Sequence, residues 1–261
     1  MDVVRSSVDG LSVAFEDRGT GAPALVFIHG LTGDHSDFEA QMSFFEMSNR
    51  VVGIDLPGSG ASGRDRLEWT MAAFGRDVVD VVEHLEMDDL VLIGHSFGGD
   101  VTVEAAKRLH DRVRALVWVS SYRSLGGVKS DSQLEEWLAP FSTDFAAAMD
   151  DLTRRNFGPN ADPVQVDDVA AKARGADPTR AIDVLAAKLY NEPALLDGLS
   201  KIDAPVFAIN PGFKPNDQPS LDTYNIELTV INDVGHFVMM EDPDRFNHAL
   251  SLILTGLTTP A

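Results

Sequence analysis

Residues 90–99 read Leu90-Val91-Leu92-Ile93-Gly94-His95-Ser96-Phe97-Gly98-Gly99. The four apolar residues at the start, rich in branched side chains, predict a buried strand. The glycines that follow permit a turn that side chains would block. Apolar residues then recur at helical spacing between Val101 and Leu109. Ser96 is therefore expected at a sharp corner between a strand and a helix, in the pattern Gly-x-Ser-x-Gly.

Such a corner has a chemical consequence for Ser96. It lifts the serine hydroxyl off the edge of the sheet. It also directs the free N–H groups at the start of the helix toward whatever the hydroxyl attacks. A serine between glycines is common in plain turns, but the buried strand before it and the helix after it favour a nucleophile.

The rest of the chain repeats the order of strand and helix. The expected strands are residues 3–8, 11–15, 24–28, 51–54, 90–93, 115–119, 205–209 and 228–231. Continuous apolar runs such as 24–28 are typical of strands buried on both faces. The alternation predicts an α/β fold, with a mainly parallel eight-stranded sheet and helices on both faces. In such sheets ligands bind beyond the carboxyl ends of the strands, where Ser96 and the glycine-rich loop 29–33 are both expected.

Between about residues 122 and 199 the strand pattern stops. Apolar side chains recur there at three- and four-residue steps, which predicts helices. We expect a core formed by 1–121 and 200–261, with 122–199 as an inserted helical lid. The aromatic side chains of the lid either pack it against the core or line the substrate pocket; the candidates for the pocket are Trp137, Phe141 and Phe145.

Composition narrows the possible partners. The chain has 261 residues, 44% of them hydrophobic, and a net charge of −20. This charge repels phosphate backbones and anionic lipids, so neither nucleic acid nor a membrane surface is an expected partner. There is no cysteine, hence no disulfide and no thiolate metal site, and the N-terminus lacks the pattern of a signal peptide. We expect a cytoplasmic protein that acts on a small molecule.

A serine hydroxyl needs a base within hydrogen-bonding reach to act as a nucleophile at neutral pH. Among the seven histidines, His236 follows the last expected strand and so lies at the same sheet edge as Ser96. It is the preferred base, and His35, near that edge, is a second candidate. The histidines on surface helices are expected to be solvated.

The sequence resembles the α/β-hydrolase family. The resemblance covers nearly the whole chain and rests on His29-Gly30, Asp55-Leu56-Pro57-Gly58-x-Gly60-x-Ser62, Gly94-His95-Ser96-Phe97-Gly98-Gly99 and Gly235-His236-Phe237. It implies Ser96 as the nucleophile and His236 as the general base and acid, with serine far upstream of histidine. The N–H groups of Leu31 and Phe97 would form the oxyanion hole. It implies no metal and no cofactor.

In the family an acidic residue completes a catalytic triad with the serine and the histidine. The position of this acid is where the sequence departs most from the family pattern. In many family members it lies a few residues after the penultimate strand, where this chain has Pro215 followed by Asp217. Asp217 is the preferred candidate; Asp203, Asp222 and Asp233 are alternatives. Some relatives carry the acid after the sixth strand, where this chain has the uncharged pair Ser120-Ser121. A neutral partner for His236 is thus a further possibility.

These residues predict a cofactor-free serine hydrolase that cleaves a small carboxylic ester or lactone through an acyl-enzyme. Related proteins use the same groups to cleave carbon–carbon bonds or to form peracids, and both reactions stay open as alternatives. A ligand-binding homologue with little turnover is the alternative from a different class.

Overall fold

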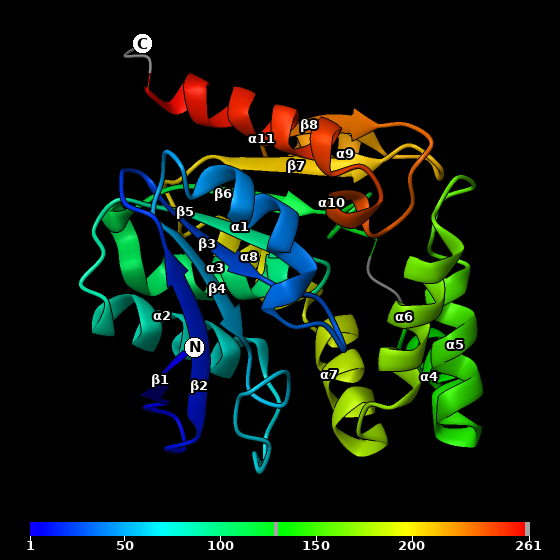
Figure 1. Cartoon of the computed structure of the whole chain (residues 1–261). Coiled ribbons are helices and arrows are strands. Elements are labelled where there is room, and N and C mark those ends of the chain that lie inside the picture. Colours follow the sequence, from blue (N-terminus) through cyan, green and yellow to red (C-terminus); the bar gives the residue numbers. More distant parts are fainter. Residues whose placement is uncertain (128–129, 259–261) are drawn as a thin grey trace.

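The computed structural model describes residues 1–127 and 130–258. Eight strands form one sheet in the order β1-β2-β4-β3-β5-β6-β7-β8 (Figure 1). Their bounds are β1 Asp2–Arg5, β2 Ser12–Arg18, β3 Ala24–Ile28, β4 Val51–Asp55, β5 Leu90–His95, β6 Val113–Val119, β7 Val206–Pro211 and β8 Ile226–Ile231. β2 runs antiparallel to both its neighbours, and the other pairs are parallel. The predicted mainly parallel, eight-stranded sheet is confirmed.

Alternate side chains of the central strands point into two separate cores. Val26 and Leu92 belong to one core, whereas Phe27 and Ile93 belong to the other, as the two-residue period of a strand requires. The first core is completed by α2 Met71–His84, α3 Gly98–Leu109 and α8 Glu192–Leu199. The second is completed by η1 His35–Phe38, α1 Glu39–Phe45, α10 Val238–Glu241 and α11 Pro243–Thr258. Helices therefore cover both faces, as predicted, and Figure 1 shows α11 opposite α2 and α3.

The register of the central strands brings four loops to one edge. Ile28 pairs with Gly94, and Val119 pairs with both His95 and Ile209. Strands β3, β5, β6 and β7 therefore end side by side. The loops that follow them carry the oxyanion-hole candidate, the nucleophile candidate and both possible positions of the triad acid.

Helices occupy most of the chain between β6 and β7. They are α4 Asp131–Thr143, α5 Phe145–Arg154, α6 Pro163–Arg174, α7 Pro178–Tyr190 and α8. Helices α4 to α7, hereafter the helical insertion, share an apolar cluster of their own that includes Phe141, Met149 and Leu185. Leu31, from the loop after β3, packs against this cluster. In Figure 1 α4, α5 and α6 stand together beside the sheet.

Three short helices were not predicted as separate elements: α8, at the end of the expected helical lid, α9 Gln218–Asp222 and α10. Each has eight residues or fewer, which is too short for a helical period to stand out. The longest helix, α11, has 16 residues. Within the described part of the chain, no helix combines the length and apolar character needed to cross a membrane.

Candidate active site

Ser96 occupies the corner between β5 and α3. Its φ angle is 56°, in the left-handed region that few residues other than glycine adopt. The Ser96 N–H donates to the carbonyl of Val119 at 2.9 Å, which ties the corner to β6. A Cβ atom at Gly98 would lie 2.6 Å from the Ile28 carbonyl oxygen, so only glycine fits beside β3. The expected strand, turn and helix are all present.

Ser96 and His236 line the same cavity, which has a volume of about 210 Å³. The wall also includes His95, Leu31 and Trp137 from the sequence analysis. The remaining lining residues are Thr32, Met149, Leu152, Thr153, Asn156, Leu185, Lys188, Leu189 and Phe237. The structure thus brings together the nucleophile candidate, the base candidate and one face of the helical insertion, around a space that suits a small molecule.

The loop that carries His236 is held by its backbone. The His236 N–H donates to the Asn156 carbonyl at 2.6 Å. The carboxylate of Glu241 accepts from the N–H groups of Gly235 at 2.9 Å and Phe237 at 3.2 Å. The role of Glu241 was not predicted from the sequence. The signal that could have found it is a carboxylate five residues after His236, near the start of a helix.

The Nδ1 atom of His236 contacts a serine and not a carboxylate. Ser120, directly after β6, places its Oγ 2.8 Å from Nδ1. Like Ser96, Ser120 has a left-handed backbone, with φ of 51°. Ser120 therefore occupies the place in which the sequence analysis expected the carboxylate of Asp217.

Asp217, which was expected beside His236, instead caps a short helix, so this prediction is wrong. Its side chain accepts from the Ser220 N–H at 3.4 Å and caps α9. Within the described ranges, no hydrogen bond joins Asp217 to His236. The physical reason is the turn after β7: the aspartate lies at the start of a short helix, where a carboxylate satisfies free N–H groups.

His95 packs directly against His236, with the two ring centroids 4.6 Å apart. Its Nε2–H donates to the His236 carbonyl at 3.0 Å. Burial lowers the pKa of His95 to about 4. Burial, followed by smaller effects of nearby positive groups, holds the pKa of His236 well below its usual value. Both rings are therefore neutral near pH 7, as a general base must be.

The loop after β3 lies against the Ser96 corner. A Cβ atom at Gly30 would be 3.2 Å from the Ser96 Cβ. Within the described residues, the N–H groups of Leu31 and Phe97 donate to no carbonyl or side chain. Both N–H groups are thus available to an oxyanion. The Phe97 ring itself packs on Phe74 at 5.5 Å and does not line the cavity.

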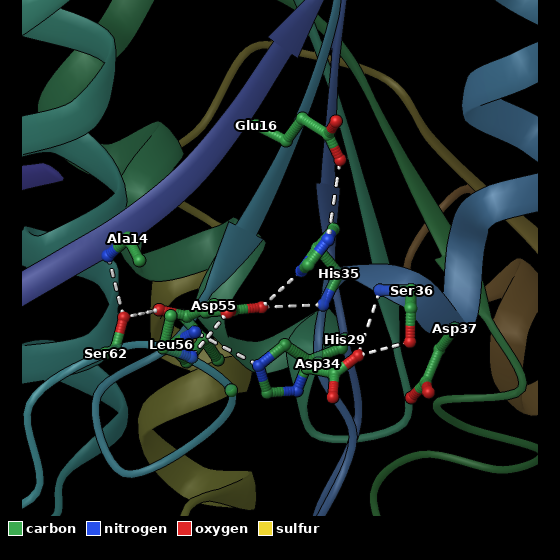
Figure 2. Close-up of polar contacts among 12 residues, drawn as sticks. Ala14, Glu16, His29, Asp34, His35, Ser36, Asp37, Asp55, Leu56 and Ser62 are labelled. Carbon is green, nitrogen blue, oxygen red and sulfur yellow. Dashed lines mark hydrogen bonds and ion pairs between the residues drawn. The ribbon is translucent and has the colours of Figure 1, made fainter. Parts of the chain in front are cut away.

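A polar network fixes this loop to the one after β4, and Figure 2 shows its members. The Leu56 N–H donates to Nε2 of His29 at 3.0 Å. The Asp55 carboxylate accepts from Nδ1 of His35 at 2.8 Å and from the Ala61 N–H at 2.8 Å. His35, the second candidate for the base, is therefore engaged in supporting the loops.

The same network contains three side chains of the kinds that bind metal ions. Asp34, His35 and Asp55 each place one donor atom within 4.8 Å of the others. Each already has a partner, because Asp34 binds Ser36 and Lys172 while Asp55 binds His35. We therefore interpret the group as a hydrogen-bonded support of the fold.

The three aromatic residues of the helical insertion differ in position. Trp137 lines the cavity with Ser96. Phe141 is buried and packs on Trp137 with centroids 5.1 Å apart, and Phe145 belongs to the same apolar cluster. Neither phenylalanine belongs to the wall of the cavity. For these two the alternative interpretation, packing within the insertion, is the one that fits.

Residues 25–249 match the model of the alpha/beta hydrolase family. The protein belongs to this family, and the resemblance stated from the motifs is confirmed.

Two solved structures share the fold over nearly the whole chain. A thermophilic esterase from Thermogutta terrifontis is 22% identical with a TM-score of 0.83, and the match covers 99% of this chain and 100% of that one. An enol-lactonase from Burkholderia xenovorans LB400 is 20% identical with a TM-score of 0.79, covering 95% and 98%. At these identities the likeness shows the fold alone.

Curated relatives match in sequence over part of their length. A bifunctional esterase/perhydrolase from Acinetobacter calcoaceticus is 35% identical over 127 residues, which cover 48% of this chain and 46% of the relative. Across the curated relatives that we compared, the matched segment spans between 31% and 46% of their length.

Proposed function

We propose that the protein is a serine hydrolase that cleaves a small carboxylic ester or lactone through an acyl-enzyme. The observation that carries the proposal is the cavity of about 210 Å³ into which Ser96, at a left-handed corner, and His236 both face. A neutral histidine beside a corner serine is the arrangement that acyl transfer needs.

The reaction follows from these groups. The substrate carbonyl carbon forms a bond to the Ser96 Oγ while the hydroxyl proton passes to Nε2 of His236. The N–H groups of Leu31 and Phe97 bind the oxyanion, a contribution of about 3 kcal/mol per donor. The bond from carbon to the alcohol oxygen breaks, and the alcohol takes the proton from His236. Water, which gives a proton to His236, then attacks the acyl carbon; the bond from this carbon to the Ser96 Oγ breaks, Ser96 takes the proton from His236, and the acid is released.

Ser120 is the proposed positioning group for the base. With Nε2 free to accept from Ser96, Nδ1 carries the hydrogen and donates to the Ser120 Oγ at 2.8 Å. The hydroxyl accepts from this tautomer, but a hydroxyl can also donate, so it selects the tautomer less strictly than a carboxylate and adds no negative charge to stabilise the imidazolium.

Residues 122–199 are proposed to act as a lid, with the helical insertion as the part that covers the cavity. Trp137, Leu152 and Leu185 line the cavity together with Ser96. Apolar walls of this kind exclude water and favour a short apolar part of the substrate.

The proposal is tested with a fluorophosphonate probe and nitrophenyl esters of increasing acyl length. We expect one covalent label, on Ser96, and highest turnover for short acyl groups because the cavity is small. Labelling at another residue, or no ester turnover together with high-affinity binding, would favour the ligand-binding alternative. A 1,3-diketone, which probes carbon–carbon cleavage, would complete the panel.

Perhydrolysis is a second candidate, favoured by the esterase/perhydrolase relative. In that reaction hydrogen peroxide replaces water in the second step. Peracid formed from a short carboxylic acid and peroxide, and absent in Ser96→Ala, would support it.

A further inference from the structure

Two cations share one aromatic ring beside the loop that carries His236. Arg123 follows β6 and Lys214 follows β7, so both lie at the carboxyl edge of the sheet. The Arg123 Cζ lies 4.7 Å and the Lys214 Nζ 4.8 Å from the centroid of the Phe213 ring. The ring face attracts each cation and therefore holds two like charges close together.

Among the described residues, neither cation has a carboxylate partner. The chain has 41 acidic and 21 basic residues, and many of its cations are paired, as Lys188 is with Asp100 and Arg155 is with Asp151. Within 1–127 and 130–258, no ion pair includes Arg123 or Lys214, and the Arg123 guanidinium donates no hydrogen bond. Burial and the neighbouring Arg123 and Arg155 lower the pKa of Lys214. The positive charge of these two side chains is therefore not neutralised by any ion pair of the described residues.

This cationic pair adjoins the catalytic cavity. The Lys214 Nζ donates to the Asn156 Oδ1 at 3.4 Å, and Asn156 lines the cavity with Ser96. The carbonyl of Asn156 also accepts from the His236 N–H. Arg123 is three residues from Ser120, whose hydroxyl contacts His236. After burial and the effect of His95, the charges of Arg123 and Lys214 contribute to the low pKa of His236.

We propose that Arg123 and Lys214 form an anion subsite that binds a free carboxylate on the substrate itself, so that the protein acts on small esters or lactones that bear a carboxylate. This inference rests on the proposed function. A guanidinium offers a carboxylate two parallel N–H donors, and the adjacent ammonium adds a point charge. In a protein with a net charge of −20, two adjacent positive charges beside the cavity also draw the anionic substrate to the site.

The subsite would also complement the uncharged partner of His236. Ser120 supplies no negative charge, and the two cations oppose formation of the imidazolium. A bound carboxylate offsets their charge just when the proton moves from Ser96 to His236. The charge that a triad aspartate normally supplies would therefore come in part from the substrate.

The experiment compares two esters that differ in one charge. These are the mono-p-nitrophenyl ester of glutaric acid, with a free carboxylate, and its neutral methyl ester. Both are assayed with the wild type, Arg123→Met, Lys214→Met and Lys201→Met. Lys201 is the matched control, because it is exposed, paired with Asp197, and precedes β7 at the opposite edge of the sheet.

We expect the wild type to favour the charged ester in kcat/KM by about tenfold or more at low salt, a typical value for a charge-assisted contact. Arg123→Met and Lys214→Met should each reduce this ratio at least about fivefold, whereas Lys201→Met should not change it. About 0.5 M NaCl should reduce the wild-type ratio because it screens the pair. The acid limb of kcat, but not of kcat/KM, should lie at higher pH for the charged ester.

A second readout needs no turnover. Monomethyl glutarate and neutral dimethyl glutarate are titrated calorimetrically into Ser96→Ala. We expect the monoanion to bind more tightly, and its affinity to fall when Lys214→Met is added. Hydrolysis of the neutral ester without preference for the charged one, and equal binding of the two titrants, would overturn the subsite and leave the hydrolase proposal intact. Tighter binding of the monoanion without hydrolysis of either ester would support the subsite and refute the hydrolase proposal.

Discussion

Two serines end neighbouring strands in the same backbone conformation. Ser96 follows β5 with φ of 56°, and Ser120 follows β6 with φ of 51°. Each N–H donates to the adjacent strand, to Val119 at 2.9 Å and to Ile209 at 3.0 Å respectively. Ser96 is followed by α3, whereas Ser120 is followed by a loop. The helix leaves N–H groups free near Ser96, which suits attack; Ser120 instead meets the ring of His236.

The difference between the two corners teaches that conformation alone does not assign a role. A left-handed serine costs of order 1–3 kcal/mol and persists where the surroundings impose it. At Ser96 that strain presents a hydroxyl to the cavity. At Ser120 it presents a hydroxyl to Nδ1. Substitution at each corner should therefore have a different kinetic signature.

The largest effect is expected at the first corner. Ser96→Ala removes the group that forms the acyl bond, so kcat for a nitrophenyl ester should fall by about four to six orders of magnitude. The midpoint of thermal unfolding should change by only a few degrees. Ester kinetics and calorimetry check both. Turnover within about a hundredfold of the wild type would contradict the assignment.

At the second corner we expect a smaller loss of kcat, and a pH dependence of kcat/KM that reflects the low pKa of His236. Ser120→Ala leaves Nδ1 without a partner, and kcat should fall about tenfold to a hundredfold. Because burial keeps the pKa of His236 low, the acid limb of kcat/KM in the wild type should lie below pH 6.5. His236 then stays neutral to lower pH than an ordinary histidine.

Ser120→Asp sharpens this test. Aspartate tolerates the left-handed conformation and adds the missing negative charge, so the acid limb should move to higher pH. A pH–rate profile of the three proteins measures the shift. An unchanged acid limb in Ser120→Asp would contradict the proposed contact between Ser120 and His236.

Asp217 provides a comparison with the carboxylate that does not reach His236. Because it caps α9, Asp217→Ala should lower the free energy of unfolding by about 1 kcal/mol or less. kcat should stay within about twofold of the wild type. Denaturant unfolding and ester turnover provide the two measurements. A loss of three orders of magnitude in turnover would restore Asp217 as the triad acid.

The smallest effect is expected in the network that supports the loop opposite Ser96. The hydrogen bond to Asp55 raises the pKa of His35, so the charged pair stabilises the folded state below the unfolded pKa of about 6.5. This stability is lost as pH rises through the folded pKa. His35→Asn should therefore lower the unfolding midpoint more at pH 5.5 than at pH 8.5. Equal losses at the two pH values would contradict the charged pair.

Sequence reasoning succeeded where local rules act on long elements. The buried strands, the α2 and α3 helices and the Ser96 corner follow from apolar periodicity and glycine placement, which depend on near neighbours in the chain. It was less successful for α8, α9 and α10, which are short and stabilised by contacts with the core. Phe141 illustrates the same limit, since an apolar stripe predicts that a side chain is buried but not what buries it.

The sequence by itself determined the α/β architecture, the family and the two groups proposed for attack and proton transfer. These two groups could be predicted because Gly94 and Gly98 permit the corner at Ser96, and because the strand order places His236 at the same edge of the sheet. Only the tertiary structure decided that Ser120, and not Asp217, meets Nδ1. Ser120 and His236 are 116 residues apart in the sequence. Their contact depends on how β6 and β7 pair and on how Glu241 holds the loop of His236. The same applies to Arg123 and Lys214: each is an ordinary cation in the sequence, and the shared ring of Phe213 makes them a pair.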